Sequence, residues 1–316
     1  MGYQYGRRPP KNAPHLKLAP YLTGRWMSVP DCPTAADYLA RLGAWQMLGN
    51  DTYGNCVAVT WANVRRLVSF VLTGKDVYPS QDGVDAVYRT QNPNFPDEDN
   101  GMDIQTLLEY LVKNGGPDGV KALGFAAVDY TNADEVKAAI AIFGSVWTGV
   151  NVLKVNMTQF DQGRPWDYSV ASSVDGQHSV VSGGYGDTPA DTGALSGDEK
   201  FITWAQETSF TDAFWSHQVE EAWVVLWPEM LNDPDFLAGI DLATFAADYT
   251  AITGKPFPAV VPPAPVTPPA PPVPPVPVTP PAPNVNPIVA ELERVEKALV
   301  RAANEIAAAV KRITDC

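Results

Sequence analysis

The stretch that decides the fold is Asn50–Cys56, which reads Asn-Asp-Thr-Tyr-Gly-Asn-Cys and leads straight into a helical pattern. From Val57 to Leu72 apolar residues recur every three or four positions, which predicts a helix with one apolar face. The start of a helix offers unpaired backbone N–H groups and the positive end of the helix dipole, so a cysteine there is favoured as a thiolate. Cys56 is therefore a candidate nucleophile.

A second stretch, Gln177–Gly186, reads Gln-His-Ser-Val-Val-Ser-Gly-Gly-Tyr-Gly and predicts a strand that runs into a glycine turn. The histidine in it, His178, can take a proton from a thiol and return it to a leaving group. A cysteine at a helix start and a histidine on a strand are the nucleophile and the base of thiol hydrolases. His178 is the candidate base.

The spacing of these residues resembles the papain family. In that family a side-chain amide six residues before the nucleophilic cysteine helps to form the oxyanion hole, and a glycine stands two residues before it. Asn50 and Gly54 occupy these offsets, with Asn in place of the usual Gln. The family's catalytic histidine is followed by a small apolar run that ends in Gly-Tyr-Gly, as His178 is followed here by residues 184–186.

Further segments between and around these anchors resemble the family in the same order, and the resemblance spans roughly residues 35 to 230. It implies an α+β fold of two lobes, a helical lobe and then an antiparallel β-barrel lobe, with the active site between them. More narrowly, the chain resembles uncharacterised papain-like proteins of actinobacteria and their phages. The additional matching segments are 36–45, 101–116, 136–140 and 144–150.

The chain departs from the family at the third catalytic residue, an Asn or Asp two positions before a Trp. Alignment on Trp204, which would shield the catalytic pair, places Ile202 at that position. An isoleucine cannot accept the histidine N–H bond that fixes the tautomer and the ring angle. Gln206 and Asp212 are the nearest alternatives by sequence, so either another group orients His178 or the site is weak or inactive.

Composition and charge exclude several classes of function. The chain has 316 residues, an apolar content of 45% and a net charge of −14, which argues against non-specific binding of nucleic acid. No apolar run approaches the ~20 residues that cross a bilayer, and residues 1–17 contain no apolar signal-peptide core. Three cysteines make no disulfide framework. We therefore expect synthesis in the cytoplasm, without a signal peptide or a conventional inhibitory pro-segment.

The sequence divides into four regions. Residues 1–34 form an extended arm with a basic cluster, which we expect to lie on the main domain or on a neighbouring subunit. Residues 35–253 form the papain-like domain. Residues 254–287 are a Pro-rich linker, because sixteen prolines fall within 256–287 and exclude helix and sheet. At about 3.1 Å per residue this semi-rigid spacer reaches on the order of 100 Å.

Residues 288–316 predict a coiled-coil helix. Apolar residues follow a 4-3-4-3 spacing from Ile288 to Ile313. An isolated helix of this length is marginal in water, so its apolar stripe needs a partner. A parallel homo-oligomer is the favoured interpretation, and docking on another protein or at a membrane surface are the alternatives. The terminal Cys316 could cross-link chains or remain a free thiol.

We expect no cofactor and no metal. The loop 96–103 is rich in oxygen ligands but lacks the EF-hand spacing, which favours a solvated loop over a calcium site. The three histidines and three cysteines are too scattered for a zinc site. Cys32 is followed by no helical pattern, and His217 is expected at the surface.

Two functions fit these observations. In the first, the chain is a thiol hydrolase of low activity that cleaves a peptide or a cell-wall amide bond, with Cys56, His178 and Asn50 as its catalytic residues. In the second, the papain-like domain is a catalytically silent head on a proline stalk that acts by binding a protein partner. A phage virion decoration or fibre-like component would be an example, with avidity from the C-terminal helix.

Overall fold

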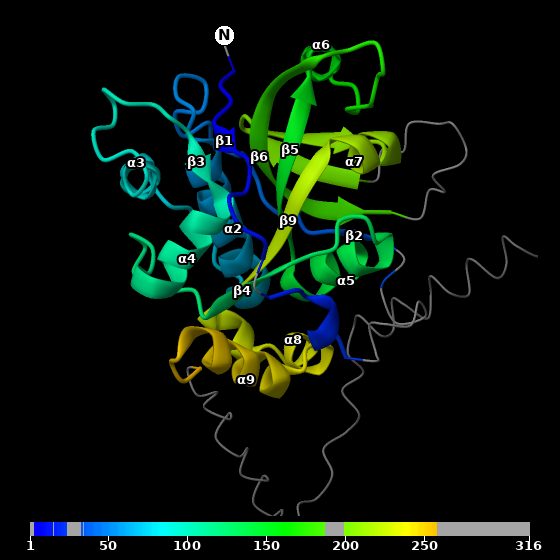
Figure 1. Cartoon of the computed structure of the whole chain (residues 1–316). Coiled ribbons are helices and arrows are strands. Elements are labelled where there is room, and N and C mark those ends of the chain that lie inside the picture. Colours follow the sequence, from blue (N-terminus) through cyan, green and yellow to red (C-terminus); the bar gives the residue numbers. More distant parts are fainter. Residues whose placement is uncertain (1–2, 15, 24–32, 34, 187–198, 258–316) are drawn as a thin grey trace, which may run out of the picture. The chain divides into compact units, whose positions relative to one another are not determined.

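The computed structural model (Figure 1) describes residues 3–14, 16–23, 33, 35–186 and 199–257. These residues belong to the first of the two compact units into which the chain divides, Met1–Pro263. The predicted C-terminal helix 288–316, and all but the first four residues of the predicted linker 254–287, lie outside the described residues. The same holds for Cys32 and Cys316.

The central helix of the domain is α2 (Cys56–Thr73). Most of its side chains are buried, Trp61 completely, because apolar residues occupy nearly every side of the helix. It ends at Gly74, whose φ of 68° closes the last turn in the left-handed conformation that glycine adopts without strain. The predicted helix at 57–72 is confirmed, but the expectation of a single apolar face is wrong, because polar side chains such as Arg65 and Arg66 are buried as well. By length and composition it is also the one helix in the described part of the chain that could cross a membrane, but here it is a core helix.

Two further helices pack beside α2 in a helical lobe, α3 (Gln81–Arg89) and α4 (Ile104–Asn114). Helix α4 lies within the segment 101–116 that resembles the papain family, and it begins at Ile104 because the Asp103 carboxylate accepts the Thr106 N–H at 2.7 Å. Immediately before α4 lies the short strand β3 (Met102–Asp103).

The second lobe is built on an antiparallel sheet with the strand order β4-β9-β5-β6-β7-β8, and β2 pairs with the end of β6. The predicted α+β class, helices first and then antiparallel strands, is confirmed. The strands are β2 (Ala36–Asp37), β4 (Gly124–Ala127), β5 (Val146–Leu153), β6 (Val174–Tyr185), β7 (Glu199–Thr203), β8 (Gln206–Phe210) and β9 (Val219–Leu226).

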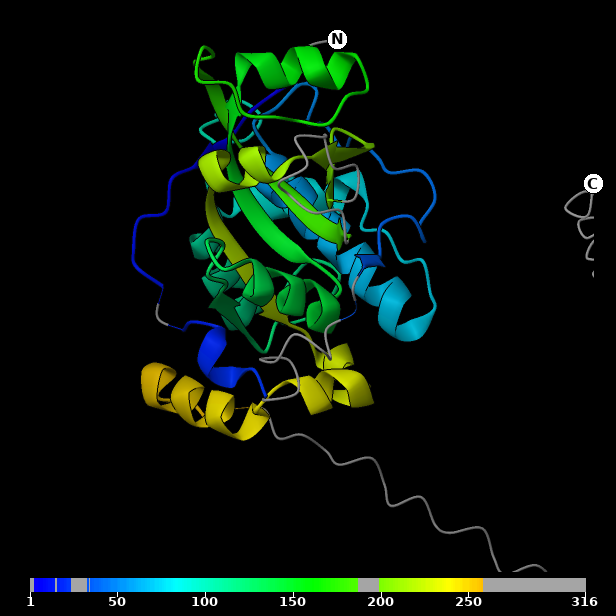
Figure 2. The ribbon, with the colours of Figure 1, turned by 90° about the vertical axis from the view of Figure 1, so that its right-hand side faces the viewer.

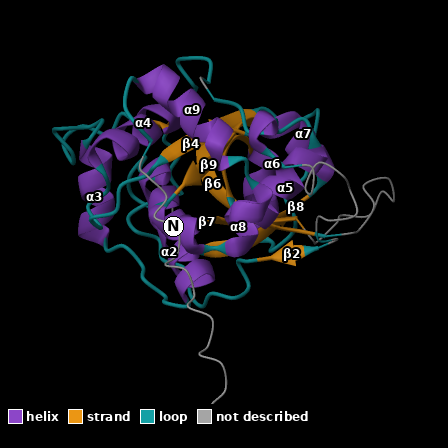
Figure 3. Ribbon diagram, turned by 90° about the horizontal axis from the view of Figure 1, so that it is seen from below, coloured by secondary structure: helices purple, strands orange, loops and turns teal. Residues whose placement is uncertain are grey.

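The remaining helices surround the sheet (Figure 3). α5 packs on β5, β6 and β9, whereas α6 and α7 lie against β5 at the other end of the sheet. The 3-10 helix η1 and α9 lie together (Figure 2), with the rings of Tyr21 and Phe245 5.0 Å apart. These helices are α5 (Ala133–Phe143), α6 (Lys154–Asp161), α7 (Asp212–Gln218), α8 (Pro234–Gly239), α9 (Leu242–Thr253), η1 (Ala19–Tyr21) and η3 (Pro228–Asn232).

The N-terminal arm lies on its own domain, which was one of the two locations expected from the sequence. Its strand β1 (Arg7–Arg8) pairs in parallel with β3 and lies between the helical lobe and the sheet (Figure 1). Farther along, Leu18 N–H donates to Ala127 O at 2.8 Å and extends the edge of β4. The arm therefore contacts both lobes.

Candidate active site

Cys56 is the first residue of α2 and is completely buried. The turn before it is fixed by two side chains. Asn55 Nδ2 donates to Leu48 O at 2.9 Å, and the Asp99 carboxylate accepts the Gly54 N–H at 3.0 Å with both oxygens. Asp99 comes from the acidic loop that the sequence analysis treated as solvated, and its contact with Gly54 could not be read from local spacing.

His178 lies on β6, with its ring stacked on Trp204 at a centroid distance of 4.5 Å. Its Nε2 lies 2.7 Å from Thr203 Oγ1. Its Nδ1 is buried and has no hydrogen-bond partner among the described residues. The side chain in contact with Nε2 is therefore Thr203, and not Gln206 or Asp212, the nearest candidates by sequence.

Thr203 reaches the histidine because of the sheet register and a tight turn. Val181 pairs with Ile202, so Thr203 stands one position farther on, on the face of the sheet that carries His178. The turn that follows has positive φ at both Trp204 (43°) and Ala205 (62°), the geometry of a type I′ hairpin. Ile202 instead points into the main core. Alignment with the papain family therefore places at the third catalytic position a residue, Ile202, that faces away from His178.

A buried chain of hydrogen bonds fixes α2 against the sheet near His178. Trp147 Nε1 donates to Ser179 Oγ at 2.8 Å, and the Ser179 hydroxyl donates to Thr60 Oγ1 at 3.0 Å. Thr60 stands one helical turn after Cys56, and Ser179 directly follows His178. This chain fixes the first turn of α2, which begins with Cys56, against the strand that carries His178.

Asn50 is buried, and its side-chain amide is a donor at this site. Its Nδ2 donates to Tyr53 O at 3.1 Å and to the main-chain carbonyl of Gln4, in the arm, at 3.3 Å. The same Gln4 carbonyl accepts a hydrogen bond from Trp204 Nε1 at 3.4 Å. Asn50 thus donates to a peptide carbonyl that lies across the site.

Residues 3–8 of the arm cover the site, and we call the surface that they contact the arm seat. Gly6 N–H donates to Gln177 O at 3.2 Å, and Met102 N–H donates to Gly6 O at 2.7 Å. A Cβ on Gly6 would lie 1.8 Å from Gly54 O, so only glycine fits there. The arm seat is formed mainly by Asn50, Gly54, Met102, Gln177, Trp204, Glu220 and Glu221.

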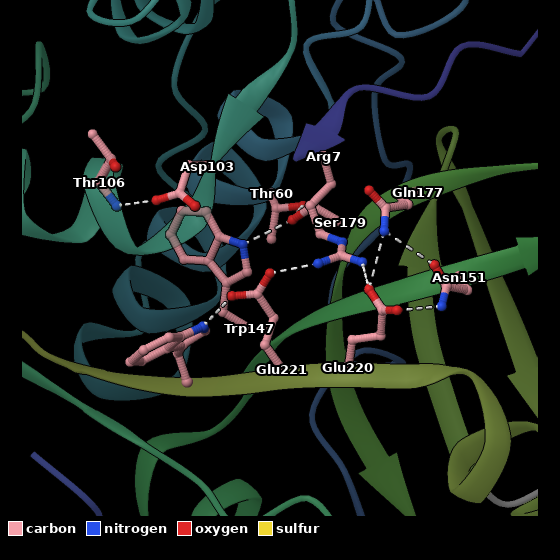
Figure 4. A network of polar contacts seen from close by, with 11 residues as sticks. Arg7, Thr60, Asp103, Thr106, Trp147, Asn151, Gln177, Ser179, Glu220 and Glu221 are labelled. Atoms are coloured by element: carbon pink, nitrogen blue, oxygen red, sulfur yellow. Dashed lines mark hydrogen bonds and ion pairs between the residues drawn. The ribbon is translucent and has the colours of Figure 1, made fainter. Parts of the chain in front are cut away.

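Arg7 enters the arm seat as a buried cation (Figure 4). Its Nη1 donates to Glu221 Oε1 at 2.7 Å, and its Nη2 is paired with Glu220. Arg7 belongs to the basic cluster of the arm, for which the sequence analysis named no acidic partner. The only sequence signal for this contact was an adjacent pair of acidic residues more than 200 positions away, on a strand whose other residues are all buried.

Burial keeps both candidate catalytic groups neutral. It raises the pKa of the Cys56 thiol to about 11, and backbone hydrogen bonds with Ser179 and Gly6 and the charge of Arg7 oppose this rise. Burial, aided by the Arg7 charge, lowers the pKa of His178 to about 3. With the arm in place, the pair is a thiol and a neutral imidazole at pH 7.

No group of three or more His, Cys, Asp or Glu side chains that could hold a metal ion occurs in the described residues. Gln206 begins β8 directly across the turn from Thr203 and is exposed, and Asp212 lies in the first turn of α7. His217 is exposed as expected, and its ring stacks on Tyr168.

No protein-family model matches the chain, and no curated protein matches it. Solved structures do. The fold is similar to that of xylellain, a cysteine protease from Xylella fastidiosa, with a TM-score of 0.55 and 14% identity over 72% of this chain and 97% of that one. It is also similar to the proform of Amb a 11, a cysteine protease and ragweed pollen allergen, with a TM-score of 0.50 and 15% identity over 71% of this chain and 73% of that one. The chain therefore has the fold of papain-like cysteine proteases, which confirms the resemblance inferred from the sequence at the level of fold.

Proposed function

We propose that this chain, with its papain-like fold, is a thiol hydrolase that cleaves amide bonds in peptides and is kept latent by its own N-terminal arm. The observation that carries the proposal is the Gln4 carbonyl, a main-chain peptide group that receives a hydrogen bond from Asn50 Nδ2 beside Cys56 and His178. A substrate peptide in place of the arm would find the same donor.

In this mechanism the Cys56 thiolate attacks the carbonyl carbon of the substrate. The negative oxygen that forms receives hydrogen bonds from Asn50 Nδ2 and from the Cys56 N–H, which has no partner within the helix at its first turn. His178 takes the thiol proton at Nδ1, the nitrogen that lacks a partner, and gives it to the leaving amine. Water then hydrolyses the thioester.

Thr203 and Trp204 act as positioning residues in this proposal. The Thr203 hydroxyl accepts the Nε2–H of His178, which leaves Nδ1 free to face the thiol. The Trp204 ring covers one face of the imidazole. A hydroxyl carries no charge, so it stabilises an imidazolium less than a carboxylate would, which agrees with a modest rate.

A second candidate is a catalytically silent head that works by binding a partner. The complete burial of Cys56, together with the unpartnered Nδ1 of His178, favours it. In both candidates the proline-rich segment carries the head and the helix 288–316 oligomerises it, which light scattering of the full chain would test. The substrate of the first candidate is a peptide, either free or part of a cell-wall cross-link.

The two candidate functions can be distinguished by displacing the arm while the residues of the arm seat stay unchanged. Gly6→Ala in the full chain places a methyl group on Gly54 O and displaces the arm, whereas a Cβ at Gly43 meets nothing within 4 Å and makes Gly43→Ala the control. Labelling of Cys56 by iodoacetamide is followed by mass spectrometry as a function of pH. Hydrolysis of a peptide library is measured on the same samples.

For a hydrolase we expect the Gly6→Ala chain to label rapidly down to about pH 5, because an ion-paired thiolate persists there, and to lose this reactivity when His178→Ala is added. It should also cleave peptides. Labelling that follows an ordinary thiol pKa of about 8.5, with or without His178, would reject the hydrolase in favour of the silent head.

A further inference from the structure

The two carboxylates that hold Arg7 are themselves fixed by the sheet, independently of the arm (Figure 4). Glu221 Oε2 accepts the Trp223 Nε1–H at 2.8 Å. Glu220 accepts hydrogen bonds from Asn151 and from Gln177 Nε2, the latter at 3.2 Å. Strands β5, β6 and β9 therefore hold both acceptors in place when the arm leaves.

The space around the pair fits one long side chain. Gly149 forms its wall, since a Cβ there would lie 2.5 Å from Glu221 Cγ and 2.8 Å from Arg7 Cδ. Beyond the pair, a cavity of about 370 Å³ continues between the arm and the sheet, and its lining includes Lys17 of the arm as well as Glu135, Glu220 and Glu221. The arm reaches this space one residue after Gly6, whose backbone lies beside the thiol of Cys56.

The two carboxylates of the pocket require a positively charged side chain between them. The Glu221 side chain is only 5% exposed, and burial raises the pKa of this carboxyl even with Arg7 present. A neutral side chain in the pocket would leave the buried Glu221 carboxylate without a counter-ion, next to the partly exposed carboxylate of Glu220. The planar guanidinium offers separate N–H groups to both carboxylates, which a lysine ammonium does less well.

We infer that the Glu220–Glu221 pair is the specificity pocket of the site, and that a peptide which replaces the arm places a basic side chain, arginine in preference to lysine, between the two carboxylates. The inference rests on the proposed function for its substrate but not for the pocket itself. In the seated arm, Arg7 then occupies the position that the basic side chain of a substrate peptide would take.

Binding tests the pocket without requiring catalysis. The probe is a labelled peptide with the sequence of residues 3–10, added to the full-length Gly6→Ala chain and followed by fluorescence anisotropy. Citrulline, the uncharged analogue of arginine, replaces either Arg7 or Arg8 of the peptide. Arg8 is the matched control because its partner is the neutral side chain of Gln91.

We expect citrulline at position 7 to weaken binding at least tenfold and citrulline at position 8 less than threefold. Adding Glu221→Gln to the chain should abolish the preference at position 7. Glu220→Gln, at a carboxylate with 34% exposure, should reduce it and serves if the first variant is unstable. Equal losses at both positions, a preference that survives both variants, or no binding of the arginine peptide would each overturn the inference.

The peptide library gives the second readout. Cleaved peptides should carry arginine, and then lysine, at one fixed position relative to the cut, and Glu221→Gln should remove this enrichment. Cleavage without such a preference would overturn the pocket and leave the hydrolase intact. Preferential binding of the arginine peptide without any cleavage would reject the hydrolase and leave the pocket intact.

Discussion

Two buried polar clusters lie on either side of Gly6, and they are built in opposite ways. The first, Arg7 with Glu220 and Glu221, is charged and joined by two ion pairs. The second, Cys56 with His178, is neutral, and His178 Nδ1 has no partner. The same burial that strengthens the ion pairs suppresses the ionisation of the thiol and the imidazole. In the proposed function, the charged cluster holds the arm in place and the neutral cluster is kept inactive by the arm.

The largest effect is expected from breaking the charged cluster. Arg7→Met keeps much of the side-chain length but leaves Glu221 without its cation, which for a buried pair costs about 3–5 kcal/mol. The arm should leave its seat, and iodoacetamide labelling of Cys56 at pH 8 should become faster by about 100-fold or more.

Arg8→Met is the matched control, because it removes an adjacent guanidinium whose partner is uncharged. It should change the labelling rate of Cys56 by less than tenfold. If both variants label alike, the ion pairs of Arg7 do not hold the arm, and the contrast between the two clusters is wrong.

Lowering the pH should displace the arm from the arm seat, because His178 of the neutral cluster becomes protonated. The pKa of His178 is about 3 with the arm seated, and we expect it to return toward 6.5 when the ring is exposed. The open form then binds more protons between these values, so the stability of the seated arm is lost as the pH falls below about 6.5. From pH 7 to pH 5 the open population should rise about 25-fold.

Hydrogen exchange of the peptide that contains Gly6, corrected for intrinsic rates, measures this population. The same ratio in His178→Gln isolates the contribution of the imidazole from that of the other titratable groups near the arm, Glu221 among them. If the ratio in His178→Gln equals that of the unsubstituted chain, protonation of His178 does not contribute to displacement of the arm.

A smaller effect is expected at Thr203, which gives the neutral cluster its one strong hydrogen bond. Thr203→Val keeps the shape of the side chain and leaves the buried Nε2 of His178 without an acceptor, at a cost of about 1–2 kcal/mol in the free energy of unfolding. Thr203→Ser should restore most of this stability. Urea denaturation of both variants tests the assignment, and equal stabilities would contradict it.

The fold was predicted from the resemblance of short motifs to the papain family, and the two elements that carry these motifs are long and strongly patterned. The apolar helix after Cys56 and the strand that carries His178 each form as the spacing indicates. The site partner Thr203 could not be predicted, since its place depends on a turn in which Trp204 and Ala205 both adopt positive φ. Counting back from the tryptophan therefore reached the neighbouring Ile202.

The arm seat, too, could not be predicted from local sequence patterns. β1 is two residues long and has no periodicity, so its partner strand is set by contacts that are remote in sequence. The ion pair of Arg7 with Glu221 spans 214 positions. Opposite charges at the two ends of a domain are common, and only the folded sheet makes this pair specific.

The smallest effect should come from the rim of the arm seat, where Tyr5 tests whether the arm is held by polar contacts in general or by the buried cation in particular. Its hydroxyl donates to Asp175 Oδ2 at 2.9 Å in an exposed position, and its ring packs edge-on to His178 and Trp204. Tyr5→Phe removes only the hydroxyl, so we expect a loss of about 0.5–1 kcal/mol and an about two- to fivefold faster labelling of Cys56.

Tyr3→Phe is the control for this change, because the Tyr3 ring packs on Trp204 and its hydroxyl makes no hydrogen bond with the described residues. It should leave the labelling rate unchanged. If Tyr5→Phe instead matched Arg7→Met, the arm would be held by many equivalent contacts. If Arg7→Met speeds labelling much more than Tyr5→Phe does, the single buried cation holds the arm. A competing peptide with one basic side chain would then be sufficient to displace the arm.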